Sequence, residues 1–473
     1  MLFNSFEFAL FLPIIFLLYW IIGGQNIRWQ NVLILIGSYF FYGAWDSRFL
    51  ILILLSSLID YYAGIIIDKS SSHLKKKIIL WLSIVWNLGV LFIFKYYNFF
   101  IESLGQLLEL DPQSSLYTSF QIILPVGLSF YTFQTLSYTI DVYRGKIKPT
   151  HKLLEFLCFV SFFPQLVAGP IERASFLLPQ FFKERKFDTL LAKEGLRQVL
   201  WGLFKKMVIA DNLALAVNEI FANPESFQSL ELFYGLVLFY FQIYCDFSGY
   251  ADVAIGTAKL LGFRLSINFN LPHFAESIPD FWRKWNITLS RWFRDYVHIP
   301  LLKNRKRNIY TNSAGLFVTF FLIGLWHGAN WTFIAFGVIH AAYMIGNRIK
   351  TDYLRANKLK TGTPRVLSIG ITFILVVLSI VFFRAPTISI AWNILSRIFS
   401  MLPDNDFETL IGMNLLFLPL MLLLELVLRN KEYPFQNLQM HIPKIGRWCI
   451  YYIFVYFILR YGGPKESFIY FQF

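Results

Sequence analysis

The chain has 473 residues, of which 56% are hydrophobic, 19% aromatic and only 15% charged. A soluble protein of this length needs far more polar surface, so this composition excludes a soluble globular protein and predicts an integral membrane protein. The formal net charge of +14 comes from Lys and Arg that stand between apolar segments. There they orient a membrane protein and contact anionic lipid, so the lipid bilayer is the expected partner and nucleic acid is not.

The N-terminal apolar run is not expected to be a cleavable signal peptide. Residues 1–27 contain neither Lys nor Arg, so the positive region of such a peptide is missing. No small-residue cleavage site follows the run. We therefore expect it to be retained as a membrane segment.

Uncharged runs close to the length of a membrane-spanning helix recur along the whole chain. Candidate spans are 5–22, 30–45, 48–67, 78–98, 119–140, 196–217, 230–247, 312–326, 330–346, 366–384, 412–428 and 447–461. The expected fold is an all-α polytopic membrane protein with about 11–13 transmembrane helices. We expect residues 1–473 to form a single integral membrane domain.

The charges of the loops predict an orientation. Basic clusters lie at 75–77, 144–152, 183–206, 303–307, 348–360 and 429–447. The intervening loops 101–118 and 218–229 contain acidic residues and no Lys or Arg. The positive-inside rule then places the basic loops in the cytoplasm and both termini outside, in a multi-pass protein of the cell inner membrane.

Two stretches do not read as simple spans. Residues 153–182 are apolar but broken by Pro164, Gly169 and Pro170, which predicts a re-entrant segment covered by protein. Residues 248–302 mix aromatic and charged groups. We expect them to form helices that lie at the cytoplasmic interface and dip into the core.

His327 interrupts the apolar run 312–346, between Trp326 and Gly328. Ionisable groups at membrane depth are costly and tend to mark function, and imidazole suits proton transfer near neutral pH. The alternative is a core histidine that is hydrogen-bonded to a neighbouring helix. Small residues beside it favour close approach of backbone or ligand, whereas His340 lies on an ordinary helical face and is expected to be structural.

The densest cluster of polar and aromatic groups reads SIPDFWRKWNITLSRWFRDYVHIPLL. Ser277 and Asp280 predict a capped helix start. Beyond it, Trp282, Asn286 and Ser290 recur at helical spacing and are expected to share one face. An amphipathic interfacial helix explains most of this cluster. Asn286 is the exception, because an amide inside an aromatic-walled face needs a partner.

A second cluster, YCDFSGYADVAIGTAKLLG, crowds polar groups at the expected end of an apolar segment. Asp246 would orient a base or bind a substrate hydroxyl. Alternatively, Asp246 and Ser248 cap helix ends while Gly249 turns the chain. The sequence leaves both interpretations open.

Several catalytic signatures are missing from the chain. It contains no Walker loop, Gly-x-Ser-x-Gly, HExxH, CxxC or Rossmann fingerprint, which counts against ATP hydrolysis, zinc proteolysis and hydride transfer. Cys158, Cys245 and Cys449 have no metal-like spacing. We therefore expect no metal and no bound cofactor.

Five stretches together resemble the membrane-bound O-acyltransferase (MBOAT) family, and within it the bacterial alginate O-acetyltransferase branch. They read LPVGLSFYTFQTLSYTIDVYRG, FPQLVAGPIER, YCDFSGYADVAIGTAKLLGF, FWRKWNITLSRWFRDYVHIPL and GLWHGANWTFIAFGVIHA. The opening MLFNSFEFALFLPIIFLLYW fits the same branch. The resemblance places an MBOAT-like core at residues 120–350, with additional spans at 1–119 and 351–473.

The resemblance implies a many-helix core with a funnel open to the outside and a narrow tunnel from the cytoplasm. His327 takes the position of the family's catalytic histidine and is the expected general base. The family's other site falls at Asn286, where the nearest relatives are expected to carry histidine and distant eukaryotic members use asparagine. The Asn286 amide would orient the base or donate to the developing oxyanion.

The expected donor substrate is acyl-CoA, in particular acetyl-CoA, or an acyl-carrier thioester. Arg283 and Arg291, on the expected cytoplasmic side, would hold the phosphates of CoA. Expected substrate-binding residues are Asp246, Ser248, Trp282, Arg283, Arg291 and Trp326.

The function expected from these residues is O-acyl transfer, in particular O-acetyl transfer, from a cytoplasmic thioester towards a hydroxyl of an extracytoplasmic polysaccharide. The acceptor would be the glycan itself or a partner acetyltransferase outside the membrane. A membrane transporter or flippase for a lipid-linked or polyol substrate is the alternative, although no inverted repeat supports it. A catalytically inactive scaffold is a third possibility, because Asn286 replaces the expected histidine.

Overall fold

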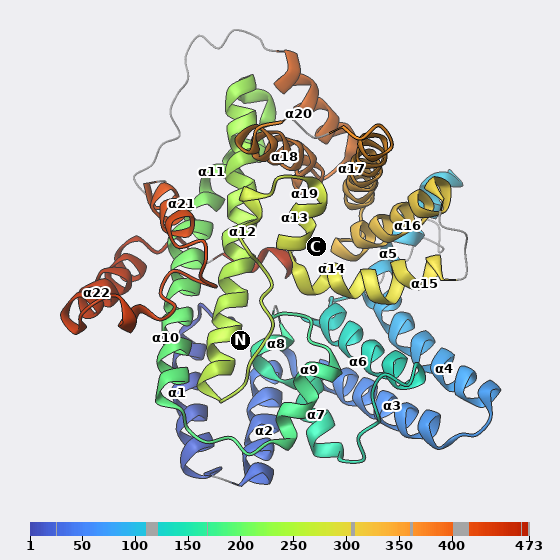
Figure 1. Ribbon diagram of the computed structural model, residues 1–473, viewed down its shortest axis with the longest axis vertical. Coiled ribbons are helices and arrows are strands. Elements are labelled where there is room, and N and C mark those ends of the chain that lie inside the picture. Colours follow the sequence, from blue (N-terminus) through green and yellow to red (C-terminus); the bar gives the residue numbers. More distant parts are fainter. Residues whose placement is uncertain are drawn as a thin grey trace. The chain divides into compact units, whose positions relative to one another are not determined.

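The computed structural model describes residues 1–24, 26–109, 122–167, 169–303, 308–359, 363–400, 416–464 and 466–471. All regular structure in these ranges is helical (Figure 1). The expected all-α fold is therefore confirmed. Contacts group the chain into two compact units, residues 1–196 with 254–266 (unit 1) and residues 197–253 with 267–473 (unit 2). The single integral domain stays a prediction.

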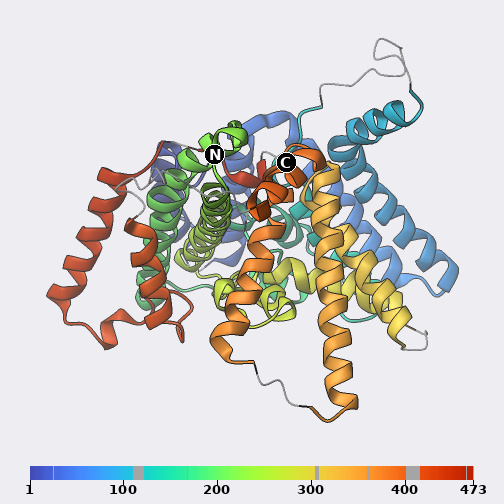
Figure 2. The ribbon, with the colours of Figure 1, turned by 90° about the horizontal axis from the view of Figure 1, so that it is seen from above.

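Unit 1 is built mainly from long apolar helices. They are α1 (Phe6–Ile21), α2 (Ile27–Asp46), α3 (Leu50–Lys69), α4 (His73–Leu91), α5 (Tyr97–Leu107) and α6 (Leu128–Tyr143). Helices α3, α4 and α6 lie side by side (Figure 2). Asp60 of α3 is fully buried and accepts hydrogen bonds from Ser83 and Asn87 of α4 and from Thr139 of α6. A buried carboxylate needs such donors, so this one side chain ties three helices together.

The broken segment expected at 153–182 is present in unit 1. It forms α7 (Leu153–Ser161), α8 (Phe163–Leu166), α9 (Ala174–Leu177) and the 3-10 helix η4 (Leu178–Phe182). The carbonyl of Phe159, near the first break, accepts hydrogen bonds from the side chains of Gln134 (2.5 Å) and Gln165 (3.0 Å). Buried amides thus satisfy the interrupted backbone, as broken structure at membrane depth requires. Its re-entrant placement in a bilayer stays a prediction.

Unit 2 carries the residues of chemical interest. Its helices are α10 (Thr189–Leu203), whose first half belongs to unit 1, η5 (Phe204–Ala210), α11 (Asp211–Ala222), α12 (Ser229–Leu260), which belongs to unit 1 from Ala254 on, α13 (Ile278–Lys284), α14 (Ile287–Phe293), η8 (Arg294–His298), α15 (Ile299–Leu302), α16 (Ile309–His327), α17 (Trp331–Ala356), α18 (Arg365–Ser379), α19 (Val381–Arg384), α20 (Ile388–Ser400), α21 (Phe417–Val427) and α22 (Lys444–Tyr461). Helices α16 and α17 pair along their length (Figure 1). Segment 466–471 returns into this unit after α22.

Among the described residues, five helical stretches are long and apolar enough to cross a membrane. They are Ile27–Lys69, His73–Leu107, Ser229–Leu260, Ile309–His327 and Arg365–Arg384. Each predicted span falls on helix over its described residues apart from single residues at 5, 22, 330, 380 and 428, and 119–140 is helical only from Leu128. Outside the described ranges lie residues 119–121 and 412–415 of the predicted spans, 110–118 of loop 101–118, and 304–307 and 360 of the basic clusters. The number of crossings, about 11–13, stays a prediction.

The expectation that the chain turns at Gly249 is wrong. Helix α12 continues through this residue to Leu260. A Cβ atom on Gly249 would lie 2.8 Å from the carbonyl oxygen of Gly202 in α10. The missing side chain therefore serves close packing of two helices and not a turn.

Replacing Gly249 with Leu should overpack this contact and lower the free energy of unfolding by about 1–3 kcal/mol. The thermal unfolding midpoint of the detergent-solubilised protein measures the effect. Gly346→Leu in α17 is the matched control, because no atom lies within 4 Å of its Cβ position. Equal midpoints for the two variants would contradict the close approach of α10 and α12.

Candidate active site

His327 is the last residue of α16 and is only 2% exposed. The helix ends there because Gly328 is extended and the chain turns into α17. Asn330 begins α17 by accepting a hydrogen bond from the backbone N–H of Thr332 at 2.9 Å. This short connection places the imidazole at the end where α16 and α17 are joined.

Four aromatic rings surround the imidazole of His327. Ring centroids lie 5.0 Å away for Trp326 and Phe383, 5.6 Å for Tyr470 and 6.0 Å for Phe336. These rings come from α16, α19, segment 466–471 and α17, and together we call them the ring wall. The ring wall separates the imidazole from bulk water.

Glycines let the two helices that carry the site approach closely, as expected for Gly324. A Cβ atom on Gly324 would lie 3.1 Å from the Cα atom of Gly337 in α17. A Cβ atom on Gly328 would collide with the ring of Phe333. Small residues here therefore serve helix packing beside His327.

Asn286 lies at a break in the chain and not inside a helix. It stands between α13 and α14 in the left-handed region, with φ 39° and ψ 57°. The expectation that Trp282, Asn286 and Ser290 share one helical face is therefore wrong. Asn268 stabilises the break by accepting hydrogen bonds from the backbone N–H and the hydroxyl of Thr288. Asparagine tolerates this backbone conformation better than most residues.

The side chain of Asn286 is 1% exposed, and neither its oxygen nor its nitrogen has a hydrogen-bond partner among the described residues. A buried polar group left unpaired costs about 1–3 kcal/mol. Such a group is a candidate to bind a ligand. The amide is thus available to a substrate that reaches this point.

One continuous aromatic core joins the two expected catalytic positions. From His327 the ring contacts run through Tyr470 to Phe247 (4.6 Å), then to Phe269 (5.1 Å) and to Trp285 (5.2 Å). Trp285 is the residue before Asn286. The structure therefore places both positions in the same core of unit 2.

Trp282 has a structural partner, His340. The indole nitrogen of Trp282 donates to Nδ1 of His340 at 3.1 Å. Nε2 of His340 lies 3.0 Å from the hydroxyl of Ser379, which itself donates to the carbonyl of Val376. Nε2 must then carry the proton. Both nitrogens of His340 are satisfied, in agreement with the expectation of a structural histidine.

Asp246 and Ser248 lie within α12 and contact two lysines. Asp246 pairs with Lys206 at 2.6 Å, and the hydroxyl of Ser248 accepts from Lys205 at 2.9 Å. Lys205 also pairs with Asp252 at 2.6 Å. The two lysine side chains are only 3% exposed, so their inclusion in a basic cytoplasmic loop is wrong. Their position inside the predicted apolar span 196–217 was the available signal.

The two predicted donor-binding arginines lie on the surface of unit 2. Arg283 and Arg291 are exposed. Arg283 approaches Asp280 at 3.4 Å, and Ser277 caps α13 as expected. Exposure leaves both guanidinium groups within reach of a phosphate.

His273 shows what full burial does to an imidazole in this unit. It lies in the 3-10 helix η7 (Pro272–Phe274), 3.4 Å from the carboxylate of Glu425. Burial, with smaller contributions from Lys205 and Lys284, lowers the pKa of His273 to about 3. The imidazole is therefore neutral at physiological pH.

Sequence reasoning missed three aromatic residues that enclose His327, namely Phe336, Phe383 and Tyr470. Phe336 lies in the next helix, whereas Phe383 and Tyr470 come from distant parts of the chain. The run FIYFQF near the end of the sequence was the available signal, but its local pattern does not indicate what it packs against. Among the described residues, no group of three or more His, Cys, Asp or Glu side chains is arranged to hold a metal ion.

The chain is similar in sequence to known proteins. The model of the membrane-bound O-acyltransferase family, MBOAT, matches residues 48–383. The chain is 38% identical over 454 residues to the probable alginate O-acetylase AlgI of Pseudomonas aeruginosa, covering 94% of this chain and 84% of that protein. It is 31% identical over 527 aligned positions to the peptidoglycan O-acetyltransferase of Helicobacter pylori, covering 100% and 98%. It is 27% identical over 273 residues to the teichoic acid D-alanyltransferase of Bacillus subtilis, covering 52% and 65%.

The buried neutral His273 should make stability depend on pH. The pKa of the His273 imidazole is about 3 in the folded protein and 6.5 without burial. As the pH falls, the unfolded chain therefore takes up the proton first. The contribution is complete above pH 6.5 and is lost as the pH falls towards 3. Thermal unfolding midpoints across this range should fall less for His273→Gln than for the wild type. His441→Gln, at an exposed position, should follow the wild type, and identical curves for all three would refute the assignment.

Proposed function

The chain belongs to the membrane-bound O-acyltransferase family, and from this premise we propose that it transfers an acetyl group from a cytoplasmic thioester towards a hydroxyl of an extracytoplasmic polysaccharide. His327 is the general base of this proposal and Asn286 the oxyanion or orienting residue. The observation that carries it is the buried, ring-walled imidazole in the same aromatic core as the unpaired Asn286 amide.

The names of two relatives support acetyl transfer to a glycan. The Pseudomonas aeruginosa protein is named for alginate O-acetylation and the Helicobacter pylori protein for peptidoglycan O-acetylation. Both are aligned over most of their length and are more similar to this chain than the Bacillus subtilis D-alanyltransferase. Acetyl is therefore the favoured acyl group, and a polysaccharide, or a partner acetyltransferase that serves one, is the favoured acceptor.

The chemistry asks one group to accept a proton as a hydroxyl oxygen attacks the thioester carbonyl. A new C–O bond forms, the C–S bond breaks, and the thiol leaves after taking up the proton that His327 received. Positioned base catalysis of this kind contributes about 10²–10⁴-fold. The ring wall suits this role because it limits the access of water, which would otherwise hydrolyse the thioester.

Asn286 is suited to stabilise charge on the attacked carbonyl. An amide N–H aimed at a developing oxyanion acts without first breaking another hydrogen bond, provided that it has no partner in the resting protein. The Asn286 amide meets that condition among the described residues. In this proposal the asparagine donates a hydrogen bond and does not titrate, whereas a histidine at this position would titrate.

The donor enters from the cytoplasmic side in this proposal. Arg283 and Arg291 would bind the phosphates of acetyl-CoA. An acyl-carrier protein would supply the same thioester on a different carrier group. Trp282, Trp326 and Ser248 keep their expected role in substrate binding in this proposal. The protein would lie in the cell inner membrane with its basic loops in the cytoplasm.

The alternative of a transporter or flippase has lost support. The family and the relatives reported above are all named for acyl transfer. The inactive-scaffold alternative is separated from the proposal by the variants below.

His327→Ala should abolish ester formation while the protein still folds. The readout is the acyl-ester content of cell-surface glycans in a deletion strain that expresses each variant at equal level. The expected loss is about 10²–10⁴-fold, because the base is removed. His441→Ala, at an exposed position, should restore esters fully. Full restoration of ester content by His327→Ala would contradict the proposed mechanism.

Asn286 variants separate the amide from the backbone. Asn286→Gly keeps the left-handed conformation and removes the amide, and Asn286→Asp keeps the shape but removes the N–H donor. Both should lower ester content by about 10²–10³-fold, the usual effect of losing one oxyanion donor. Wild-type ester levels in Asn286→Asp would show that no donor is needed there. Inactivity of the wild type itself would favour the scaffold.

A further inference from the structure

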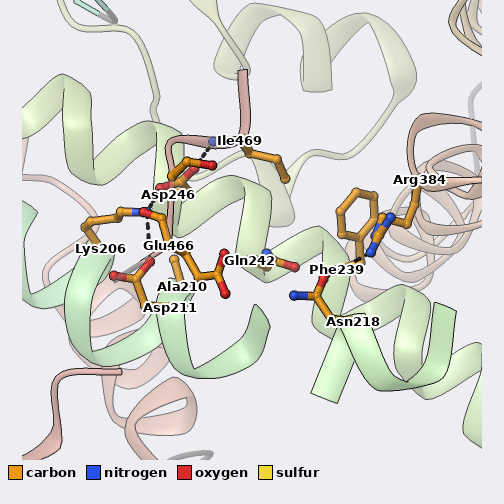
Figure 3. A pocket seen from close by; sticks show the side chains of 11 residues that line it. Lys206, Ala210, Asp211, Asn218, Phe239, Gln242, Asp246, Arg384, Glu466 and Ile469 are labelled. Atoms are coloured by element: carbon orange, nitrogen blue, oxygen red, sulfur yellow. Dashed lines mark hydrogen bonds and ion pairs between the residues drawn. The ribbon is translucent and has the colours of Figure 1, made fainter. Parts of the chain in front are cut away.

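A narrow polar cavity in unit 2 lies next to a buried ion cluster (Figure 3). The ammonium group of Lys206 lies 2.6 Å from Asp246 in α12 and 2.7 Å from Asp211 in α11. All three side chains are at most 4% exposed. Two carboxylates and one ammonium group thus meet inside the protein, at the point where segment 466–471 arrives.

Segment 466–471 is bound by this ion cluster through its backbone. The amide N–H of Ile469 donates to Asp246 at 2.7 Å, as Figure 3 shows. The ammonium group of Lys206 donates to the carbonyl of Glu466 at 3.2 Å. Glu466 and Ile469 are therefore held by the same pair of charges.

The chain leading to this segment is also attached to η5 and α11. The amide of Gly463 donates to the carbonyl of Met207 at 2.9 Å. The side chain of Asn212 donates to the carbonyl of Tyr461 at 2.8 Å. The end of α22 and Gly463 are thus held against η5 and α11 by hydrogen bonds.

Beyond the ion cluster, the segment enters the aromatic core. The ring of Phe468 lies 4.5 Å from Tyr250 and 5.6 Å from Phe247. The ring of Tyr470, two residues later, lies 5.6 Å from His327 and 6.1 Å from Trp326. The residue held by Asp246 is therefore the neighbour of a residue in the ring wall.

A second lysine–aspartate pair on the same two elements offers a comparison, although its aspartate is 13% exposed. Lys205, the neighbour of Lys206, pairs with Asp252, which also accepts from Gln198. Among the described residues, the hydrogen bonds and ion pairs of this pair join α10, η5 and α12. One lysine–aspartate pair thus joins helices, and the other joins helices to the segment beside His327.

We propose that Asp246 and Lys206 are positioning residues for acyl transfer, which hold segment 466–471 so that Tyr470 completes the ring wall beside His327. The inference rests on the proposed role of His327. Asp246 acts through the Ile469 amide and does not touch the reacting atoms. This role differs from the substrate contact and from the helix cap that the sequence left open for Asp246.

The physical basis is the strength and direction of the bond to Ile469. A hydrogen bond from an amide to an ionised carboxylate is roughly twice as strong as one between neutral groups. Lys206 keeps Asp246 in place and prevents an unpaired buried charge. Misplacing a group beside a reacting centre by about 1 Å lowers the rate by about 10²-fold.

The test compares Asp246→Ala, Asp246→Asn and the matched control Asp252→Ala in the full-length protein. Hydrogen–deuterium exchange of peptides that cover 466–471 reports whether the segment is held. Ester content of cell-surface glycans, normalised to folded protein, reports acyl transfer. Asp246→Asn keeps an oxygen for the Ile469 amide, and Lys206 keeps Asp211.

Asp246→Ala should increase exchange in 466–471 and lower ester content by about 10–100-fold. Asp246→Asn should show a smaller change in both, and Asp252→Ala should leave both at the wild-type level even where its unfolding midpoint falls. Unchanged exchange in Asp246→Ala overturns the proposal, as does normal ester content with increased exchange. Equal losses for Asp246→Ala and Asp252→Ala overturn it too. Failure of the proposed function looks different, because the wild type itself then restores no esters.

Discussion

The charge of Lys206 inside the protein constrains most of unit 2. An isolated ammonium group is too costly to bury, so carboxylates must lie within contact distance. Asp211 and Asp246 meet this need from α11 and α12. Their positions fix how α12 faces the helix that carries Lys206, and the close contact of Gly202 with Gly249 lets the two helices approach far enough. Asp246 in turn has an oxygen left for the segment that ends beside the imidazole of the site.

Three buried histidines in the same unit differ only in their surroundings. His340 has partners on both nitrogens and locks α13 against α17 and α18. His273 lies beside Glu425 with a pKa far below its ordinary value because of burial. His327 stands at a helix end among aromatic rings. The three side chains are chemically identical and all buried, so the residues that contact each imidazole decide its role. All three contact the aromatic core beside Asn286, and His327 differs from the other two in standing at the end of a long helix.

Much of the local structure followed from the sequence because its causes are local. Apolar runs predicted the helices, and Ser277 predicted the start of α13. Proline and glycine predicted the broken segment of unit 1. Expectations failed where a distant residue changes what a local pattern means. Gly249 has the pattern of a turn, but Gly202 makes it a packing site. Asn286 has helical spacing to Trp282, but Asn268 stabilises a left-handed break there.

The sequence by itself determined that this is an all-helical membrane protein of the O-acyltransferase family, with a histidine and an asparagine as candidates for its chemistry. Hydropathy, helix caps and short motifs depend on residues that are close together in the chain, so they can be recognised from the sequence alone. Only the tertiary structure decided that Tyr470 lies against His327, that Lys206 is buried, and that Asp246 holds a backbone amide. These contacts join residues far apart in the chain, and no local pattern encodes them because they depend on how whole helices pack.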